Sequence, residues 1–183
     1  MRRMSVTLHT AGHGNRSAEE FVALLKETGI GVLVDVRAHP ASKRHPQFAR
    51  AALEAELARA GIDYVWEGKD LGGFRKPRPD SPHLALAAEG FRGYADHMET
   101  AAFEAATGRL VEMADKRRVA IMCAEKNPAE CHRSFISDWL VAHGVAVMHL
   151  IGPGQSQTHQ LNPSARIIDA RLIYDRLAQG ALF

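Results

Sequence analysis

Short apolar runs alternate with segments of helical periodicity along most of this chain, and that alternation constrains its fold more than any other feature. Five segments are apolar and as short as strands: residues 6–8, 31–36, 62–66, 119–122 and 145–151. Five segments between and after them have helical spacing of apolar residues: 17–29, 46–60, 91–97, 100–116 and 134–143. Strands that alternate with helices are typical of parallel sheets. We therefore predict an α/β fold with a mostly parallel central sheet of about five strands and helices on both faces.

The length of the chain favours a single domain. With 183 residues, of which 46% are hydrophobic, the sequence can form one substantial core. Residues 67–88 are rich in Gly, Pro, Lys, Arg and His, which is typical of a long functional loop. We predict one domain over residues 1–183, in which residues 152–183 form a C-terminal loop and a helix, at 167–178, packed on the rest.

The helix predicted at residues 17–29 has the clearest local signals. Ser17 and Glu20 form a capping-box pattern, and Gly29 is placed to end the helix. Phe21 and Leu24 share one face. These residues define the start and the end of the first helix more closely than periodicity alone.

Composition limits the partners and the compartment of this protein. The formal net charge is +2, which is too small to indicate a nucleic-acid binder by itself. Cationic residues nevertheless gather at residues 37–50 and 74–79. The chain has two cysteines, no signal peptide and no apolar run that could span a membrane. We therefore expect a protein of the reducing cytoplasm with no membrane partner.

Polar residues occur where the predicted strands end. Residues 9–16, 35–37, 67–69 and 123–133 each lie at the end of one of the first four apolar runs. Carboxyl ends of parallel strands meet at one edge of a sheet, which is the usual place for a ligand. The sequence therefore predicts one site at this edge, built from segments that lie far apart in the chain.

Cys123 is the candidate nucleophile of the predicted site. A thiol that precedes a helix and lies near Lys126, His132 and Arg133 would have its thiolate favoured by positive charge and by the helix dipole. The alternative for Cys123 is a small buried residue at a strand end. Cys131, predicted at the first turn of the same helix, is a resolving thiol, a metal ligand or a structural residue.

Arginines near this edge favour an anionic ligand. Arg37 at a strand end and Arg133 after the cysteines are predicted to bind a phosphate or carboxylate. The alternative for Arg37 is a salt bridge with Asp35. Residues 12–16 form a glycine-containing loop before a helix, where amide groups can receive an anion. The predicted ligand-binding residues are Asn15, Arg16, Arg37, Arg75, Lys126 and Arg133.

Proton transfer is assigned to groups that titrate near neutral pH and to the carboxylates beside them. His13 and His132 are the candidate acids or bases, because imidazole changes charge near pH 7. Asp35 or Glu125 would orient an imidazole or carry a proton. The alternatives are a turn or capping role for His13 and a solvated loop position for Glu125. With Cys123, these four residues make up the predicted catalytic set.

The two cysteines also suggest metal or redox chemistry. Together with His13 and His132 they offer four possible ligands. Their eight-residue separation, without a second CxxC pair, does not match common structural zinc spacings, so we predict no metal site. The sequence identifies no cofactor. A redox-active pair would need its Cα atoms about 5.5 to 6 Å apart.

Six groups of residues occur in an order that resembles the DUF488 family. They are Gly12-His13-Gly14-Asn15-Arg16-Ser17, Val34-Asp35-Val36-Arg37, Gln47-Phe48, Leu71-Gly72-Gly73, Gly90-Phe91-Arg92-Gly93-Tyr94-Ala95, and Met122-Cys123-Ala124-Glu125 with Cys131-His132-Arg133. The resemblance covers roughly residues 6–151. It implies a compact cytosolic α/β domain with its site at these positions, and no reaction, because that family has no established function. Gly14 departs from the family pattern, which usually has a serine there.

From these observations we expect an enzyme that binds an anionic, phosphate-bearing or nucleotide-like small molecule, with Cys123 as nucleophile. One alternative is a non-catalytic module that binds nucleic acid or a nucleotide through residues 37–50 and 69–79. Aromatic side chains would then add stacking surfaces, namely Phe48, Trp66 and Phe74. Another alternative is a thiol redox or metal-sensing protein. Salt separates the first two, because contacts to several phosphates weaken steeply as salt rises.

Overall fold

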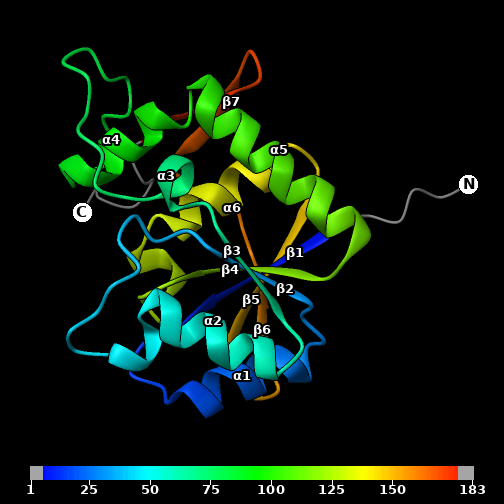
Figure 1. The fold of residues 1–183 in the computed structure, drawn as a ribbon. Coiled ribbons are helices and arrows are strands. Elements are labelled where there is room, and N and C mark those ends of the chain that lie inside the picture. Colours follow the sequence, from blue (N-terminus) through cyan, green and yellow to red (C-terminus); the bar gives the residue numbers. More distant parts are fainter. Residues whose placement is uncertain (1–5, 177–183) are drawn as a thin grey trace, which may run out of the picture.

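Six strands form one central sheet in the computed structural model, which describes residues 6–176 (Figure 1). The strands are β1 (Thr7–Gly12), β2 (Val32–Asp35), β3 (Asp63–Trp66), β4 (Val119–Cys123), β5 (Ala146–Gly152) and β6 (Gln155–Thr158). They lie in the order β3-β2-β4-β1-β5-β6. The first five are parallel to their neighbours, and β6 pairs antiparallel with β5. The predicted α/β fold with a mostly parallel sheet is confirmed, and β6 adds an antiparallel edge to it.

Helices cover both faces of this sheet. The helices are α1 (Ala18–Glu27), α2 (Arg50–Arg59), α3 (Gly68–Leu71), α4 (Glu89–His97), α5 (Ala101–Lys116) and α6 (Arg133–Ala142), and the 3-10 turns are η1 (Pro46–Phe48) and η2 (Pro128–Glu130). In Figure 1, α1 and α2 lie below the sheet, whereas α5 and α6 lie above it. Between residues 6 and 176, no helix is both long and apolar enough to cross a membrane.

The sheet divides the core into two clusters, because successive side chains of a strand point to opposite faces. Leu33 of β2 packs in the cluster that contains Phe21 of α1 and Leu57 of α2. The next residue, Val34, packs in the cluster that contains Phe103 of α5. All five side chains are fully buried. A continuous apolar run such as residues 31–36 is therefore what a strand covered on both faces requires.

The first helix begins as the capping-box pattern predicts. The Ser17 hydroxyl accepts a hydrogen bond from the backbone N–H of Glu20 at 3.1 Å, and the Glu20 carboxylate accepts one from the N–H of Ser17 at 2.8 Å. The helix ends at Glu27, two residues before the predicted Gly29. The backbone N–H groups of Ser17 and Glu20 are thus both satisfied, which fixes the start of α1 a few residues after the end of β1.

The first strand is longer than predicted. β1 continues to Gly12, so the prediction that a polar loop begins at His9 is wrong. His9 and Thr10 are buried strand residues, and only from His13 onward does the chain leave the sheet. Polar side chains are typical of loops, so the sequence predicts a loop at these positions. A buried strand can hold them only where a hydrogen-bond partner satisfies them, and the sequence does not identify that partner.

The predicted C-terminal helix at residues 167–178 is wrong over its described part. The chain forms a hairpin of β7 (Ala165–Ile168) and β8 (Arg171–Tyr174) instead, and residues 177–178 lie outside the described part. Leu172 and Tyr174 are buried, whereas Arg171 is exposed. That two-residue alternation belongs to a strand and was mistaken for a helical pattern.

The order of the strands makes two chain connections diverge at the carboxyl edge of the sheet. β1 and β4 are neighbours, with Gly12 paired to Cys123 at their ends. The chain leaves β1 toward α1 on one face and leaves β4 toward α6 on the other (Figure 1). Ligands of open α/β sheets bind where such connections diverge.

Candidate functional site

The end of β1 and the loop that follows β4 are joined closely by backbone hydrogen bonds. The N–H of His13 donates to the carbonyl of Cys123 at 3.1 Å, and the N–H of Gly14 donates to that of Ala124 at 2.8 Å. A side chain on Gly12 would collide with the carbonyl of Glu125. Gly14 has a φ of +54°, so a serine there would be strained. The glycines therefore allow the two segments to approach.

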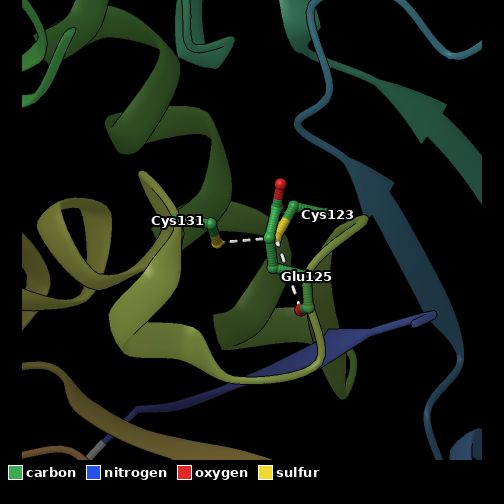
Figure 2. A group of neighbouring side chains, drawn as sticks. All are labelled: Cys123, Glu125 and Cys131. Atoms are coloured by element: carbon green, nitrogen blue, oxygen red, sulfur yellow. Dashed lines mark hydrogen bonds between the residues drawn. The ribbon is translucent and has the colours of Figure 1, made fainter.

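Both cysteines lie at this junction, with their sulfurs in contact. Cys123 ends β4, Cys131 follows η2, and their side chains are 1% and 4% exposed. The two Sγ atoms are 2.7 Å apart and belong to free thiols (Figure 2). Figure 2 also shows the Glu125 side chain running beside both sulfurs. The proximity that a redox-active pair of thiols would require is therefore present in the fold.

The surroundings of the two thiols favour ionisation of Cys131 over Cys123. Burial raises the pKa of Cys123, and its hydrogen bond to Cys131 raises it further. Burial also opposes the Cys131 thiolate, but the hydrogen bond from Cys123 and the charge of Arg133 lower the pKa of Cys131 overall. The backbone N–H of Arg133, at the start of α6, lies 3.4 Å from Cys131 Sγ. Cys131 is thus the better thiolate and Cys123 its hydrogen-bond donor.

A cavity of about 360 Å³ lies beside the thiol pair. Its walls come from residues 37–39 after β2, Gly73 and Phe74 after α3, residues 90–94 of α4, and the loop that carries both cysteines. The segments after β2 and β4 therefore meet as predicted. Residues 12–16, after β1, do not line this cavity.

His132 presents one ring nitrogen to the cavity. Its Nε2 lies 2.9 Å from the carbonyl oxygen of Val36, so Nε2 carries the proton. Nδ1 has no hydrogen-bond partner among residues 6–176, and a side-chain Cβ at Gly73 would lie 3.3 Å from it. Burial lowers the pKa of His132, so the imidazole is neutral at pH 7. Nδ1 is therefore a proton acceptor at the cavity wall.

Arg133 lies behind the thiols rather than in the cavity. Its side chain is 1% exposed and donates to Thr10 Oγ1 at 3.0 Å and to the carbonyls of Glu125 and Lys126 at 2.8 and 3.3 Å. Its Nε is buried and has no hydrogen-bond partner among the residues that the structure describes. The guanidinium thus holds the 125–126 backbone and places its charge beside Cys131, and the anion-binding role of Arg133 stays a prediction.

A chain of buried hydrogen bonds, which we call the relay, continues from Thr10. Thr10 Oγ1 lies 2.7 Å from His149 Nδ1, His149 Nε2 lies 2.9 Å from His159 Nδ1, and His159 Nε2 lies 2.8 Å from Asp138 Oδ1. The other carboxylate oxygen accepts from the Tyr174 hydroxyl at 2.9 Å.

The directions of these hydrogen bonds follow from the two ends of the relay. The carboxylate of Asp138 only accepts, so His159 Nε2 donates to it and His159 Nδ1 accepts a hydrogen bond from the N–H of His149. Thr10 then donates to His149 and accepts from Arg133. Burial lowers the pKa of His149 to about 3, which keeps it neutral. The relay thus connects the buried guanidinium of Arg133 to the buried carboxylate of Asp138.

Arg37 and Asp35 form the predicted alternative, a buried salt bridge. The guanidinium donates to Asp35 at 2.9 and 2.6 Å and to the carbonyl of Phe48 at 2.9 Å. The hydroxyl of Tyr64 donates to the same carboxylate at 2.7 Å. Both charges are therefore already paired, and neither their anion-binding role nor their catalytic role has support from this geometry.

The remaining predicted residues lie around the site without converging on it. His13 stacks on Phe48 with ring centroids 4.2 Å apart, and burial lowers the pKa of His13 to about 4. Arg16 donates to the carbonyls of Gly12 and Ile151, and Arg75 to those of Gly72 and Lys69. Two further predicted residues are exposed, namely Asn15 and Lys126.

Cys123, Glu125 and Cys131 are the one set of three candidate metal ligands found within residues 6–176, with ligand atoms within 4.8 Å of one another. Tetrahedral zinc, with Zn–S bonds of about 2.3 Å, would hold two sulfurs about 3.8 Å apart. The sulfurs would have to separate by about 1 Å for zinc but approach by less for a disulfide bond of about 2.05 Å. The thiol pair fits a disulfide better than a metal ion.

Sequence reasoning does not identify Thr10, Asp138 or His149. A signal was present, because His149 interrupts the apolar run at 145–151 and Asp138 directly precedes the apolar run Trp139–Ala142 of α6. A polar residue inside a buried element needs a buried partner. The pairing itself depends on the β5–β1 register, which places Thr10 opposite His149.

The comparisons with known proteins give one match. No curated protein and no solved structure matches this chain. A family model described as "Domain of unknown function DUF488" matches residues 17–140, which include the thiol pair, His132 and Arg133. Because that match spans more than half of the 183 residues, the chain belongs to the DUF488 family.

Proposed function

We propose that this protein is a thiol–disulfide oxidoreductase whose reactive group is the Cys123–Cys131 pair. The observation that carries the proposal is the 2.7 Å contact between two free thiols beside a cavity of about 360 Å³. Arg133 and the Cys123 thiol stabilise the thiolate of Cys131. In this proposal Cys131 is therefore the nucleophile and Cys123 is the resolving thiol. This assignment exchanges the two roles expected from the sequence.

The reaction needs no group beyond a substrate disulfide. The Cys131 thiolate attacks one sulfur of the substrate, forms a mixed disulfide and releases the first substrate thiolate. The Cys123 sulfur then attacks Cys131 Sγ, which forms the Cys123–Cys131 disulfide and releases the second substrate sulfur. The proton of Cys123 passes to that leaving sulfur, and His132 Nδ1 is the base that can carry it. Two electrons pass from the protein to the substrate.

A cytoplasmic location is part of this proposal. A reducing compartment returns an oxidised pair to two thiols between turnovers, and it suits a chain with two cysteines. Cytoplasmic thiols of this kind are usually catalytic or redox-sensing rather than structural.

Trapping of the mixed disulfide tests the proposed roles. Each single variant, Cys123→Ser and Cys131→Ser, is mixed with hydroxyethyl disulfide, and intact mass is measured with and without reductant. We expect Cys123→Ser to gain one reducible adduct on Cys131 and Cys131→Ser to gain little. The wild-type protein should lose two hydrogens in mass without keeping an adduct.

The opposite pattern, with an adduct on Cys123 only, would restore the nucleophile expected from the sequence. Failure of the wild type to form an internal disulfide, while both variants remain folded, would reject the redox function. Circular dichroism of both variants controls for loss of the fold.

We propose nucleic-acid binding as a second candidate function, because one observation favours it. Lys43, Arg44, Lys69 and Lys76 are exposed and form no ion pair within residues 6–176. Such a surface should bind a labelled oligonucleotide with an affinity that falls steeply as salt rises. Lack of any salt-dependent binding would remove this candidate, and anion binding at the sheet edge stays an untested prediction.

A further inference from the structure

Two carboxylates at the wall of the cavity have no cationic partner. Glu125 and Glu130 both line it, and neither forms an ion pair with any Lys, Arg or His of residues 6–176. Glu130 has one weak contact, 3.4 Å from the side-chain amide of Asn127. Glu125 also lies beside both sulfurs (Figure 2).

Within residues 6–176, no guanidinium group forms an ion pair with these carboxylates. Arg37 lines the cavity, but Asp35 already pairs with it in two hydrogen bonds. Arg133 donates to Thr10 and to backbone carbonyls behind the thiols. The cavity wall therefore carries two carboxylates without an ion-pair partner among residues 6–176, whereas the Cys131 thiol has the charge of Arg133 beside it.

Aromatic rings complete the walls opposite these charges. Phe74, Phe91 and Tyr94 line the cavity, and Phe74 is 90% exposed. The backbone of Phe74 has a φ of 62°, which is unfavourable for a bulky residue. A strained, exposed aromatic side chain at a cavity is an outlier that points to ligand contact. Aromatic faces and carboxylates together attract a cationic group.

We propose that the substrate of this site is a small disulfide formed by aminothiols, whose ammonium groups lie near Glu125 and Glu130. The proposal rests on the function proposed above and adds the charge of the substrate to it. Each ammonium group keeps its proton, while the substrate disulfide accepts two electrons and leaves as two aminothiols. A cavity of about 360 Å³ suits a molecule of this size rather than a folded protein.

Three small disulfides of similar length and different charge test this proposal. Cystamine is cationic, hydroxyethyl disulfide is neutral and dithiodiglycolate is anionic. The rate of Cys131 adduct formation is measured in Cys123→Ser for each, and is divided by the rate of the same disulfide with free dithiothreitol. This ratio removes differences in intrinsic reactivity. We expect cystamine to react about tenfold faster than dithiodiglycolate on this scale, which corresponds to about 1.4 kcal/mol.

Removal of the two carboxylates should abolish the selectivity. Glu125→Gln and Glu130→Gln, combined in the Cys123→Ser background, are expected to bring the corrected rates within about threefold of each other. Glu112→Gln is the matched control, because Glu112 is exposed on α5 and lies outside the cavity. This control should keep the full preference for cystamine.

The other outcomes separate this inference from the function on which it rests. Equal corrected rates for all three disulfides would reject the charge selectivity and leave the oxidoreductase intact. A preference for dithiodiglycolate would reject it in favour of the anionic ligand predicted from the sequence. Absence of any adduct, in folded protein, would reject the oxidoreductase and the substrate class together.

Discussion

The two sides of Arg133 are built in different ways. On its inner side lies the relay, in which every side-chain polar atom of Thr10, His149 and His159 has a hydrogen-bond partner. The relay ends at the buried carboxylate of Asp138. On its outer side the cavity holds two thiols in contact, unpaired carboxylates and an exposed aromatic ring. Satisfied buried groups stabilise a fold, whereas unsatisfied groups at a cavity remain available to a ligand. The comparison indicates that the relay supports the fold, and it is consistent with our proposal that a ligand binds in the cavity.

Loss of the carboxylate of Asp138 should have the largest effect on stability. Asp138→Ala removes the acceptor of His159, Tyr174 and the backbone N–H of Asn162, all at 2.8 to 2.9 Å. Three donors are then left without a partner, and the charge of Arg133 loses its counterpart. We expect the free energy of unfolding to fall by roughly 3–5 kcal/mol, measured by urea denaturation.

Glu125→Ala is the matched change on the cavity side. Its carboxylate is exposed and unpaired, so the free energy of unfolding should change by less than about 0.5 kcal/mol. If Asp138→Ala were as mild as Glu125→Ala, the relay would have no structural role. If Glu125→Ala were as severe as Asp138→Ala, the cavity wall would be part of the core.

Acid should destabilise the fold through two buried imidazoles, that of His149 in the relay and that of His13 outside it. Burial lowers the pKa of His149 to about 3 and that of His13 to about 4, against an ordinary value of about 6.5. Between these values the unfolded chain binds protons that the folded protein excludes, so stability is complete above pH 6.5 and falls with pH. We expect a loss of roughly 2 kcal/mol per histidine at pH 5 relative to pH 7.

Urea denaturation at pH 7 and pH 5 measures this loss. His13→Gln removes one of the two imidazoles. The free energy of unfolding that the pair loses between pH 7 and pH 5 should therefore fall by about half. A pH-independent free energy of unfolding would show that these imidazoles are not buried as neutral groups.

Sequence patterns predicted the fold well because they report burial along each element. The apolar run at 31–36 gave a central strand, and Ser17 with Glu20 gave the start of a helix. The patterns gave a wrong prediction at the end of β1, where buried residues are polar, and at the C-terminal hairpin of β7 and β8. Thr10 looked like a loop residue, and Leu172 with Tyr174 looked like part of a helix.

The site was predictable in its location but not in its contacts. The ends of β2 and β4 do meet beside Cys123 and Cys131, as a parallel sheet requires. Which arginine is available to a ligand depends on partners that only packing reveals. Arg37 had its partner two residues away, but Arg133 found its partner in Thr10, more than a hundred positions earlier in the chain.

Backbone strain at Phe74, on the cavity wall, should be measurable as a change in stability. Asparagine tolerates a positive φ far better than phenylalanine, and a side chain that is 90% exposed contributes little packing. Phe74→Asn should therefore raise the free energy of unfolding by about 0.5–1 kcal/mol, measured by urea denaturation. The same variant should slow adduct formation with cystamine, because one aromatic face of the cavity is lost. If stability rises and the rate of adduct formation does not change, ligand contact does not explain the strain. If both the stability and the rate fall, Phe74 packs against the fold.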